Sequence, residues 1–259
     1  MTIPIPVIGT AIVSNPFWVT RLLMSIDYPV NEFIIINNNG RGEIDEELNS
    51  LTKITHKFVK KITVTHLPAN IGCAGAWNLI IKSRIMSPYW IIVSDDVSFG
   101  PGCLNEMVNY VDDVPDLGIV HGCEGDYSKG SWELFLITES IIKIFGLFDE
   151  NTYPAYCEDI DYIMRFIHRP IVKKFLTTKY YHGMGLPEEY CVEGSQTQKS
   201  EPELIEKLQH SKNLNSQYLT EKWGPCWNAY CPSQFPFGDK DISHTTYDLE
   251  FVRQKYLGF

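Results

Sequence analysis

The stretch Tyr89–Gly102, YWIIVSDDVSFGPG, decides the predicted fold. Its apolar opening suits a buried strand, and the chain then becomes polar at Ser94, Asp95 and Asp96. Two adjacent carboxylates repel each other and raise each other's proton affinity unless a cation compensates. Ligands of parallel α/β sheets bind outside the carboxyl ends of the strands, so this acidic pair marks the first candidate site.

Short apolar runs alternate with helical patterns on both sides of this stretch. We expect strands at 7–14, 32–37, 61–67, 89–94, 116–122 and 132–138, and helices at 16–26, 74–83, 139–148 and 158–167. This alternation predicts an α/β fold with a mixed, mainly parallel sheet flanked by helices. We assign this domain to residues 1–200.

The remainder of the chain follows a different pattern. KYYHGMG, residues 179–185, is expected to be a loop, and residues 203–223 form an amphipathic helix that Gly224 and Pro225 end. The segment that follows is rich in proline, aromatic and polar residues and is expected to wrap the surface or cap a groove. We therefore treat residues 201–259 as a helical and irregular extension of the same domain.

Composition excludes several classes of protein. The 259 residues are 44% hydrophobic, enough for one sizeable core, and carry a formal net charge of −10. Nucleic acids and anionic membranes attract basic surfaces, so neither is an expected partner. The N-terminus lacks the pattern of a secretory signal and no run is long enough for a transmembrane helix, so we expect a cytoplasmic protein.

The chain has seven cysteines, at positions 73, 103, 123, 157, 191, 226 and 231. The number is odd, no CxxC pair occurs and the spacing is irregular. We expect reduced, mostly buried thiols in preference to disulfides or a zinc site.

A hard divalent cation would resolve the charge conflict between Asp95 and Asp96. Mg²⁺ and Mn²⁺ are held by one or two carboxylates while phosphate oxygens complete the coordination shell. The alternative is that the pair caps the next segment or is solvated.

Two further segments follow strands and could contact an anionic or nucleoside ligand. PANIGCAGAWN, residues 68–78, brings Gly72 and Gly75 to the start of a helix, where free N–H groups could receive an anion. NNNG, residues 37–40, offers amide side chains able to bind a base or ribose. Both segments also suit ordinary turns.

YCEDIDYIMRF, residues 156–166, is the strongest local cluster. On a helix, Glu158 and Asp161 share a face, Asp161 pairs with Arg165 at i,i+4, and Asp159 is rotated away from that pair. One carboxylate could therefore face a cleft as a general base while Asp161 and Arg165 secure the scaffold. The alternative is an acidic first turn favoured by the helix dipole.

Taken together and in this order, these segments resemble the family 2 type of inverting glycosyltransferases, nucleotide-sugar-dependent enzymes with the GT-A fold. The matching segments are IGTAIVSNPFWVTRLLMSI, INNNG, LPANIGCAGAWN, SDDV, GLFDE and EDIDYIMR. The resemblance extends from about Val7 to Gly185, with an echo in YLTEKWG, and is strongest to the rhamnosyltransferase-like members.

The resemblance implies roles for particular residues. Asp96 corresponds to the metal ligand on the donor diphosphate and Asp95 lies near the ribose or sugar. Asp159 corresponds to the catalytic base, Glu158 to an acceptor-binding residue or alternate base, and His182 to a histidine that completes the metal shell. The implied donor contacts, besides Asp95, are Thr10, Asn38, Asn39, Asn70, Gly72, Gly75 and Asn78.

The implied reaction is metal-assisted transfer of a sugar, rhamnose or another hexose, from a UDP, dTDP or GDP donor to a hydroxyl of a glycan or glycoconjugate. Family members often carry an acidic residue where this chain has Asn37, Asn38 and Asn39, so the nucleotide stays open. Trp132, Trp223 and Trp227 are candidates for stacking on sugars or for ordinary packing. The rival interpretations are a nucleotidyltransferase and a noncatalytic nucleotide-sugar or carbohydrate-binding module.

Overall fold

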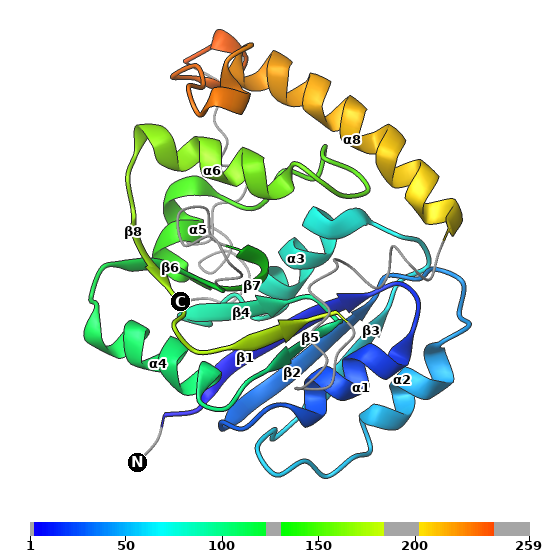
Figure 1. Ribbon diagram of the computed structural model, residues 1–259. Helices are drawn as coiled ribbons and strands as arrows, with labels where there is room; N and C mark the ends of the chain where they lie inside the picture. Colours follow the sequence, from blue (N-terminus) through cyan, green and yellow to red (C-terminus); the bar gives the residue numbers. More distant parts are fainter. Residues whose placement is uncertain (1–2, 123–130, 184–201, 241–259) are drawn as a thin grey trace.

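A computed structural model describes residues 3–122, 131–183 and 202–240 of the chain. Within these residues, a seven-stranded sheet has the order β3-β2-β1-β4-β7-β6-β8 (Figure 1). The strands are β1 (Ile5–Ile12), β2 (Val30–Asn37), β3 (Ile62–His66), β4 (Tyr89–Val93), β6 (Leu117–Gly122), β7 (Ser131–Thr138) and β8 (Val172–Phe175). Neighbours pair in parallel except at β7, which is antiparallel to both β4 and β6. The predicted mixed, mainly parallel sheet is confirmed.

Helices cover both faces of this sheet. One face packs against α1 (Pro16–Met24), α2 (Asp45–Leu51) and α4 (Cys103–Asp113), and the other against α3 (Gly72–Ser83), α5 (Glu139–Phe145) and α6 (Glu158–His168). Successive side chains of a strand point to opposite faces. In β4, accordingly, Ile91 packs in the first apolar cluster while Trp90 and Ile92 pack in the second. The uninterrupted apolar runs of the central strands reflect this burial on both faces.

The prediction that residues 179–185 form a loop is wrong in part. Tyr180–His182 form strand β9, which pairs antiparallel with β5 (Val97–Phe99) in a separate two-stranded sheet. Met184 and Gly185 lie outside the described residues. Three-residue strands are too short for an alternating pattern to identify, so only the tertiary pairing shows them.

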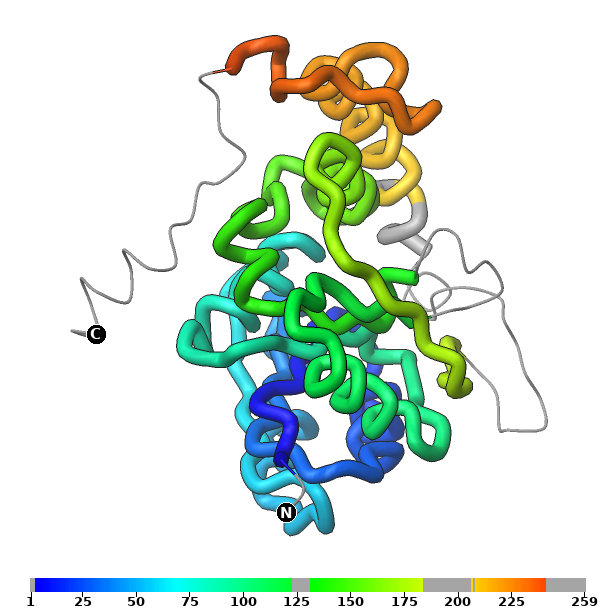
Figure 2. The backbone as a smooth tube through the Cα atoms, turned by 90° about the vertical axis from the view of Figure 1, so that its left-hand side faces the viewer, coloured from blue at the N-terminus to red at the C-terminus, as the bar shows by residue number. Residues whose placement is uncertain are grey.

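The C-terminal helix α8 (Pro202–Trp223) packs on the outer side of α6, and two short 3-10 helices follow, η1 (Trp227–Ala229) and η2 (Pro236–Gly238). Figure 2 shows α8 over α6, at the end of the molecule opposite the start of β1. Leu219 and Trp223 of α8 are fully buried against Met164 of α6.

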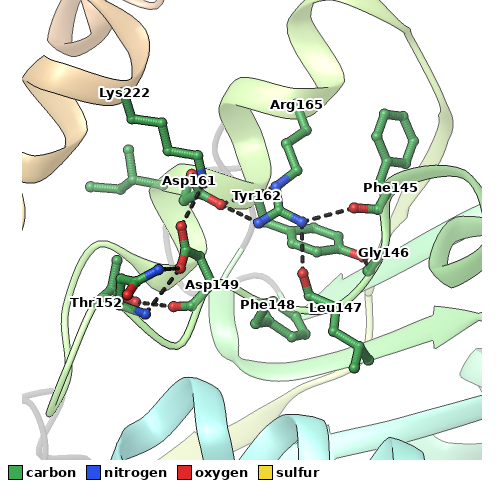
Figure 3. A network of polar contacts seen from close by, with 12 residues as sticks. Phe145, Gly146, Leu147, Phe148, Asp149, Thr152, Asp161, Tyr162, Arg165 and Lys222 are labelled. Carbon is green, nitrogen blue, oxygen red and sulfur yellow. Dashed lines mark hydrogen bonds and ion pairs between the residues drawn. The ribbon is translucent and has the colours of Figure 1, made fainter. Parts of the chain in front are cut away.

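A buried ionic network, the Asp161 network, joins α6 and α8 (Figure 3). Arg165 Nε donates to Asp161 Oδ2 at 3.0 Å, which confirms the predicted i,i+4 pair. Lys222 Nζ lies 2.7 Å from Asp161 Oδ1 and 2.6 Å from Asp149 Oδ2. The Trp223 indole donates to Asp161 Oδ1 at 2.8 Å. Two carboxylates thus face two cations, so this interior cluster has no net charge.

The network also orders the segment between α5 and α6. Arg165 Nη1 donates to the carbonyls of Phe145 and Leu147 at 2.8 and 2.7 Å. Burial alone would raise the pKa of Asp149, but the Lys222 ammonium lowers it to about 2. Both aspartates therefore stay ionised and hold Lys222 at neutral pH.

The remaining features concern cysteines and membranes. Five cysteines fall within the described residues, Cys73, Cys103, Cys157, Cys226 and Cys231, and all are free thiols. Cys123 and Cys191 lie outside them. In the part of the chain that the structure describes, no helix has the length and apolar character needed to cross a membrane.

Lys222→Met is expected to lower the free energy of unfolding by about 3 kcal/mol, because removing one partner leaves buried carboxylates uncompensated. Lys222 is 5% exposed. Urea unfolding curves measure the change. The same substitution at exposed Lys53 serves as the control and should cost no more than about 0.5 kcal/mol. Equal losses for the two variants would contradict a supporting role for the network.

Candidate functional site

A pocket of about 550 Å³ opens at the carboxyl ends of β1 and β4. Because β7 is antiparallel to β4, its first residues meet the same edge of the sheet. The start of α6 and the end of β9 contribute further residues to the wall. Many residues of the wall have side chains that form hydrogen bonds, ligate metals or exchange protons. They are Asn38, Asn70, Cys73, Asp95, Asp96, Ser131, Trp132, Glu133, Tyr156, Glu158, Asp159 and His182.

Asp95 and Asp96 follow β4 directly and are 6% and 2% exposed. Oδ2 of Asp95 is buried and has no hydrogen-bond partner among the described residues. Burial, and then the charge of Asp96, raise the pKa of Asp95 well above its usual range. Two buried carboxylates with one orphan oxygen form an arrangement that a cation would stabilise.

The pairing of β5 with β9 brings His182 to this acidic pair. Val97 lies opposite His182 in the ladder, and the Gly183 amide donates to the Asp96 carbonyl at 3.0 Å. His182 Nε2 therefore lies 3.4 Å from Asp96 Oδ1. Arg21 of α1 secures the end of β9, since its Nη1 donates to the Gly183 carbonyl at 2.9 Å.

The donor set formed by Asp96 and His182 fits a divalent cation. Carboxylate and imidazole ligands together suit Mn²⁺, and a carboxylate alone suits Mg²⁺. Among the described residues, no group of three or more His, Cys, Asp and Glu side chains is arranged to hold a metal ion. A cation here would consequently need ligand oxygens, such as those of a diphosphate, to complete its shell.

Glu158 and Asp159 begin α6 and line the same pocket. Asp159 is half-buried, and its Oδ1 accepts from the Ile160 amide at 2.8 Å. Glu158 is 7% exposed, and its Oε2 has no partner in the described part of the chain. Burial and the adjacent Asp159 raise the pKa of Glu158 to about 8, and burial raises that of Asp159 as well. Glu158 is therefore mainly protonated at neutral pH.

The predicted asparagine contacts are already engaged within the protein. Asn38 and Asn70 line the pocket, but Asn38 Nδ2 donates to Asn70 Oδ1 and to the Gly72 carbonyl, both at 3.2 Å. Asn38 Oδ1 accepts from the Ile71 amide at 2.8 Å. Asn39 lies outside the pocket wall and donates to the Val13 carbonyl at 2.6 Å. These side chains shape the rim of the pocket.

Four other residues expected to contact the sugar donor lie outside the pocket wall, namely Thr10, Gly72, Gly75 and Asn78. Thr10 is fully buried in β1, which exposes Ala11 and Val13 to the pocket instead. Asn78 is tied to the Phe148 backbone, donating to its carbonyl and accepting from its amide, both at 2.9 Å. Asn78 thus supports the fold at a position where the sequence suggested a ligand contact, whereas the buried Thr10 hydroxyl has no hydrogen-bond partner among the described residues.

The first two amides at the N-terminus of α3, which the sequence offered for an anion, donate hydrogen bonds within the protein. The Gly72 amide donates to Asn70 Oδ1 and the Cys73 amide to the Pro154 carbonyl, both at 2.8 Å. Gly72 has φ +81° and lies against Pro154, which explains the glycine there. Gly75 is buried within the helix, where a Cβ would press on Ile71.

The three tryptophans differ in position. Trp132 lines the pocket, and its buried indole N–H has no hydrogen-bond partner among the described residues. Trp223 is fully buried in the Asp161 network and Trp227 lies on η1, away from the pocket. Of these three tryptophans, Trp132 lines the pocket, together with Trp77 of α3.

Sequence reasoning missed Arg21, Ser131, Glu133 and Tyr180. Tyr180 donates to Glu133 Oε1 at 2.6 Å and its hydroxyl lies 2.9 Å from Ser131 Oγ. Polar and apolar residues alternate at the start of β7, and Glu133 is one of the polar residues. Such alternation is typical of any half-buried strand. No local signal distinguishes such a residue from an ordinary surface glutamate.

The sequence model described as Glycosyl transferase family 2 matches residues 18–175. A search of curated proteins finds no match. Among solved structures, S. aureus TarS 1-349 in complex with UDP gives a TM-score of 0.52 at 13% identity, covering 71% of this chain and 62% of that one. The mannosyltransferase PcManGT from Pyrobaculum calidifontis, in complex with GDP-Man and Mn²⁺, gives 0.54 at 12% identity, covering 68% and 57%.

GalNAc-T7 with UDP, GalNAc and Mn²⁺ gives a TM-score of 0.66 at 11% identity, covering 98% of this chain and 57% of that one. This chain therefore spans between 57% and 62% of the length of these three structures. At such identities the likeness concerns the fold, and the expected GT-A fold is confirmed.

Glu158→Gln is expected to change how stability depends on pH. The folded-state pKa of about 8 exceeds the ordinary value of 4.5, so Glu158 stabilises the fold fully only below pH 4.5 and loses this contribution as pH rises to 8. The variant lacks this loss. Relative to wild type, its free energy of unfolding should rise by on the order of 1 kcal/mol or more between pH 5 and pH 8.

Urea unfolding at a series of pH values measures this difference. Glu46→Gln, at an exposed position on α2, is the control and should leave the pH profile unchanged. Parallel pH profiles for Glu158→Gln and wild type would show that Glu158 ionises normally in the fold.

Proposed function

This chain belongs to glycosyl transferase family 2, and from that premise we propose that it transfers a sugar from a nucleotide-diphosphate donor to a hydroxyl of a glycan or glycoconjugate, with inversion. The observation that carries the proposal is the convergence of two acidic motifs in one pocket. Asp95 and Asp96 lie at the end of β4, and Glu158 and Asp159 enter from α6.

We assign donor binding to Asp96 and His182. The pair would hold Mn²⁺ or Mg²⁺, which supplies Lewis-acid stabilisation of the charge that grows on the leaving diphosphate. Their 3.4 Å separation and the orphan oxygen of neighbouring Asp95 support this assignment. PcManGT and GalNAc-T7 both have Mn²⁺ in the complexes named above.

We assign general base catalysis to Asp159. It accepts the proton of the acceptor hydroxyl as that oxygen attacks the anomeric carbon from the face opposite the diphosphate. Protonated Glu158 donates a hydrogen bond to the acceptor and leaves Asp159 as the negatively charged member of the pair. Holding donor and acceptor in line in one pocket supplies much of the acceleration, and no covalent sugar intermediate is required.

The donor is proposed as a UDP, dTDP or GDP sugar, with rhamnose or another hexose as the transferred group. Structural neighbours carry UDP, UDP-GlcNAc and GDP-Man. The segment 184–200, which we expected to help select the acceptor, lies outside the described residues.

A donor panel tests the proposal. The protein is incubated with UDP-, GDP- and dTDP-sugars, with and without Mn²⁺, and nucleotide release is measured. We expect release from at least one donor in the presence of the metal, and its loss in Asp96→Ala. Tight nucleotide binding without release or transfer would contradict an enzyme and favour the noncatalytic binding module.

Asp159→Asn is expected to lower kcat by about 10²-fold or more while donor affinity changes little, because the amide cannot accept the proton. Steady-state kinetics with the donor identified in the panel measure kcat, and calorimetry measures donor binding. Glu46→Gln is again the matched surface control. An unchanged kcat would place the base at another residue.

A further inference from the structure

Glu133 has no part in the chemistry assigned above, yet it lines the same pocket as the two acidic motifs. Its carbonyl accepts from the amide of Ser94, the residue before Asp95, at 2.7 Å. Asp159 also feels its charge, since the pKa of Asp159 is raised by burial and further by Glu133. Glu133 is therefore close to both acidic motifs.

The Glu133 carboxylate is held in place. The Tyr180 hydroxyl donates to Oε1 at 2.6 Å and also lies 2.9 Å from Ser131 Oγ. Gly122 leaves room for this phenol, since a Cβ there would come within 2.7 Å of the Tyr180 hydroxyl. Tyr180 shares β9 with His182, so one short strand positions both carboxylate and imidazole.

A hydrogen-bond donor accompanies this carboxylate. Trp132, the neighbour of Glu133, lines the pocket and is 7% exposed, and its indole N–H lacks a partner among the described residues. A buried donor without a partner is costly unless a ligand or water satisfies it. Successive side chains of β7 point to opposite faces, so Trp132 and Glu133 supply a donor and an acceptor at two different positions of the pocket wall. This combination matches a sugar ring, whose hydroxyls both donate and accept.

We propose that Glu133 is a specificity-determining residue that accepts hydrogen bonds from hydroxyls of the transferred sugar. In an in-line transfer, the sugar ring lies between the leaving diphosphate and the base, and Glu133 lines the pocket that contains the residues assigned to both. Tyr180 holds the Glu133 carboxylate in one orientation. The carboxylate then binds a sugar hydroxyl at one position of the ring and disfavours nucleotide sugars that lack a hydroxyl there. This inference rests on the proposed function.

Calorimetry separates contacts to the sugar from contacts to the nucleotide. With Mn²⁺ and no acceptor, the Kd values of UDP, GDP and dTDP, and of UDP-glucose, GDP-mannose and dTDP-rhamnose, are measured for wild type, Glu133→Ala and Glu133→Gln. We expect Glu133→Ala to weaken binding of the preferred nucleotide sugar about tenfold, as for a lost hydrogen bond to a charged group, and to change that of the bare nucleotide less than about twofold.

Several comparisons make this result interpretable. Glu133→Gln keeps the size of the side chain, so it serves if the alanine variant does not fold, and it should show a smaller loss in the same direction. Tyr180→Phe frees the carboxylate and should weaken sugar recognition in part. Glu139→Gln, on α5 outside the pocket wall, should leave every Kd unchanged.

A nucleotide sugar that lacks one sugar hydroxyl gives the most specific test. Removing the hydroxyl that Glu133 binds should weaken binding to wild type and cause no further loss of affinity in Glu133→Ala. A different outcome is that wild type binds the nucleotide sugars while the ratio of each Kd to the Kd of its bare nucleotide is the same in the Glu133 variants. In that case the inference is wrong and the proposed function stands. If wild type binds none of the nucleotides, both are wrong.

Discussion

The ion pair between Asp161 and Arg165 is the interaction on which the rest of the site depends. It lies in the first turns of α6, with side chains 0% and 1% exposed. Lys222 of α8 contacts Asp161 as well (Figure 3). The Trp223 indole donates a further hydrogen bond to Asp161. Glu158 and Asp159 precede it on the same helix. Asn215 of α8 also donates to the carbonyls of residues 155 and 156, at 3.0 and 2.9 Å, where the chain adopts positive φ just before α6. Helix α8 therefore supports the start of α6, from which this carboxylate pair enters the pocket.

Two strand pairings complete the arrangement. The antiparallel β4–β7 pair carries Glu133 to the residue before Asp95, and the β5–β9 ladder carries His182 to Asp96. Carboxylates that would repel one another are thus brought close together, and each group of carboxylates is stabilised in a different way. Lys222 and Arg165 neutralise the aspartates of the network, burial keeps Glu158 protonated, and Asp95 retains an oxygen without a hydrogen-bond partner among the described residues. We propose that a cation from solution compensates the charge at this last position.

Long periodic segments were the part of the fold that the sequence could predict. The central strands and the helices α1, α3 and α6 have patterns long enough to distinguish period 2 from period 3.6. The short elements β5, β9 and α2 do not, and they form because a partner segment distant in the chain pairs with them. The acidic motifs were found because charge after an apolar strand is conspicuous. Asn38, Gly72 and Asn78 were expected to meet a ligand, since amides and glycines serve turns and ligand sites alike, and Glu133 acquires its position only through the pairing of β7 with β4.

The central claim is that a divalent cation at Asp96 and His182 holds the diphosphate of a nucleotide sugar. Crystals grown with Mn²⁺ and a nucleoside diphosphate, with data collected at the manganese absorption edge, test it most directly. The account predicts an anomalous peak within coordination distance of Asp96 Oδ1, His182 Nε2 and diphosphate oxygens. Manganese at another position, or a nucleotide bound away from this pocket, would contradict it.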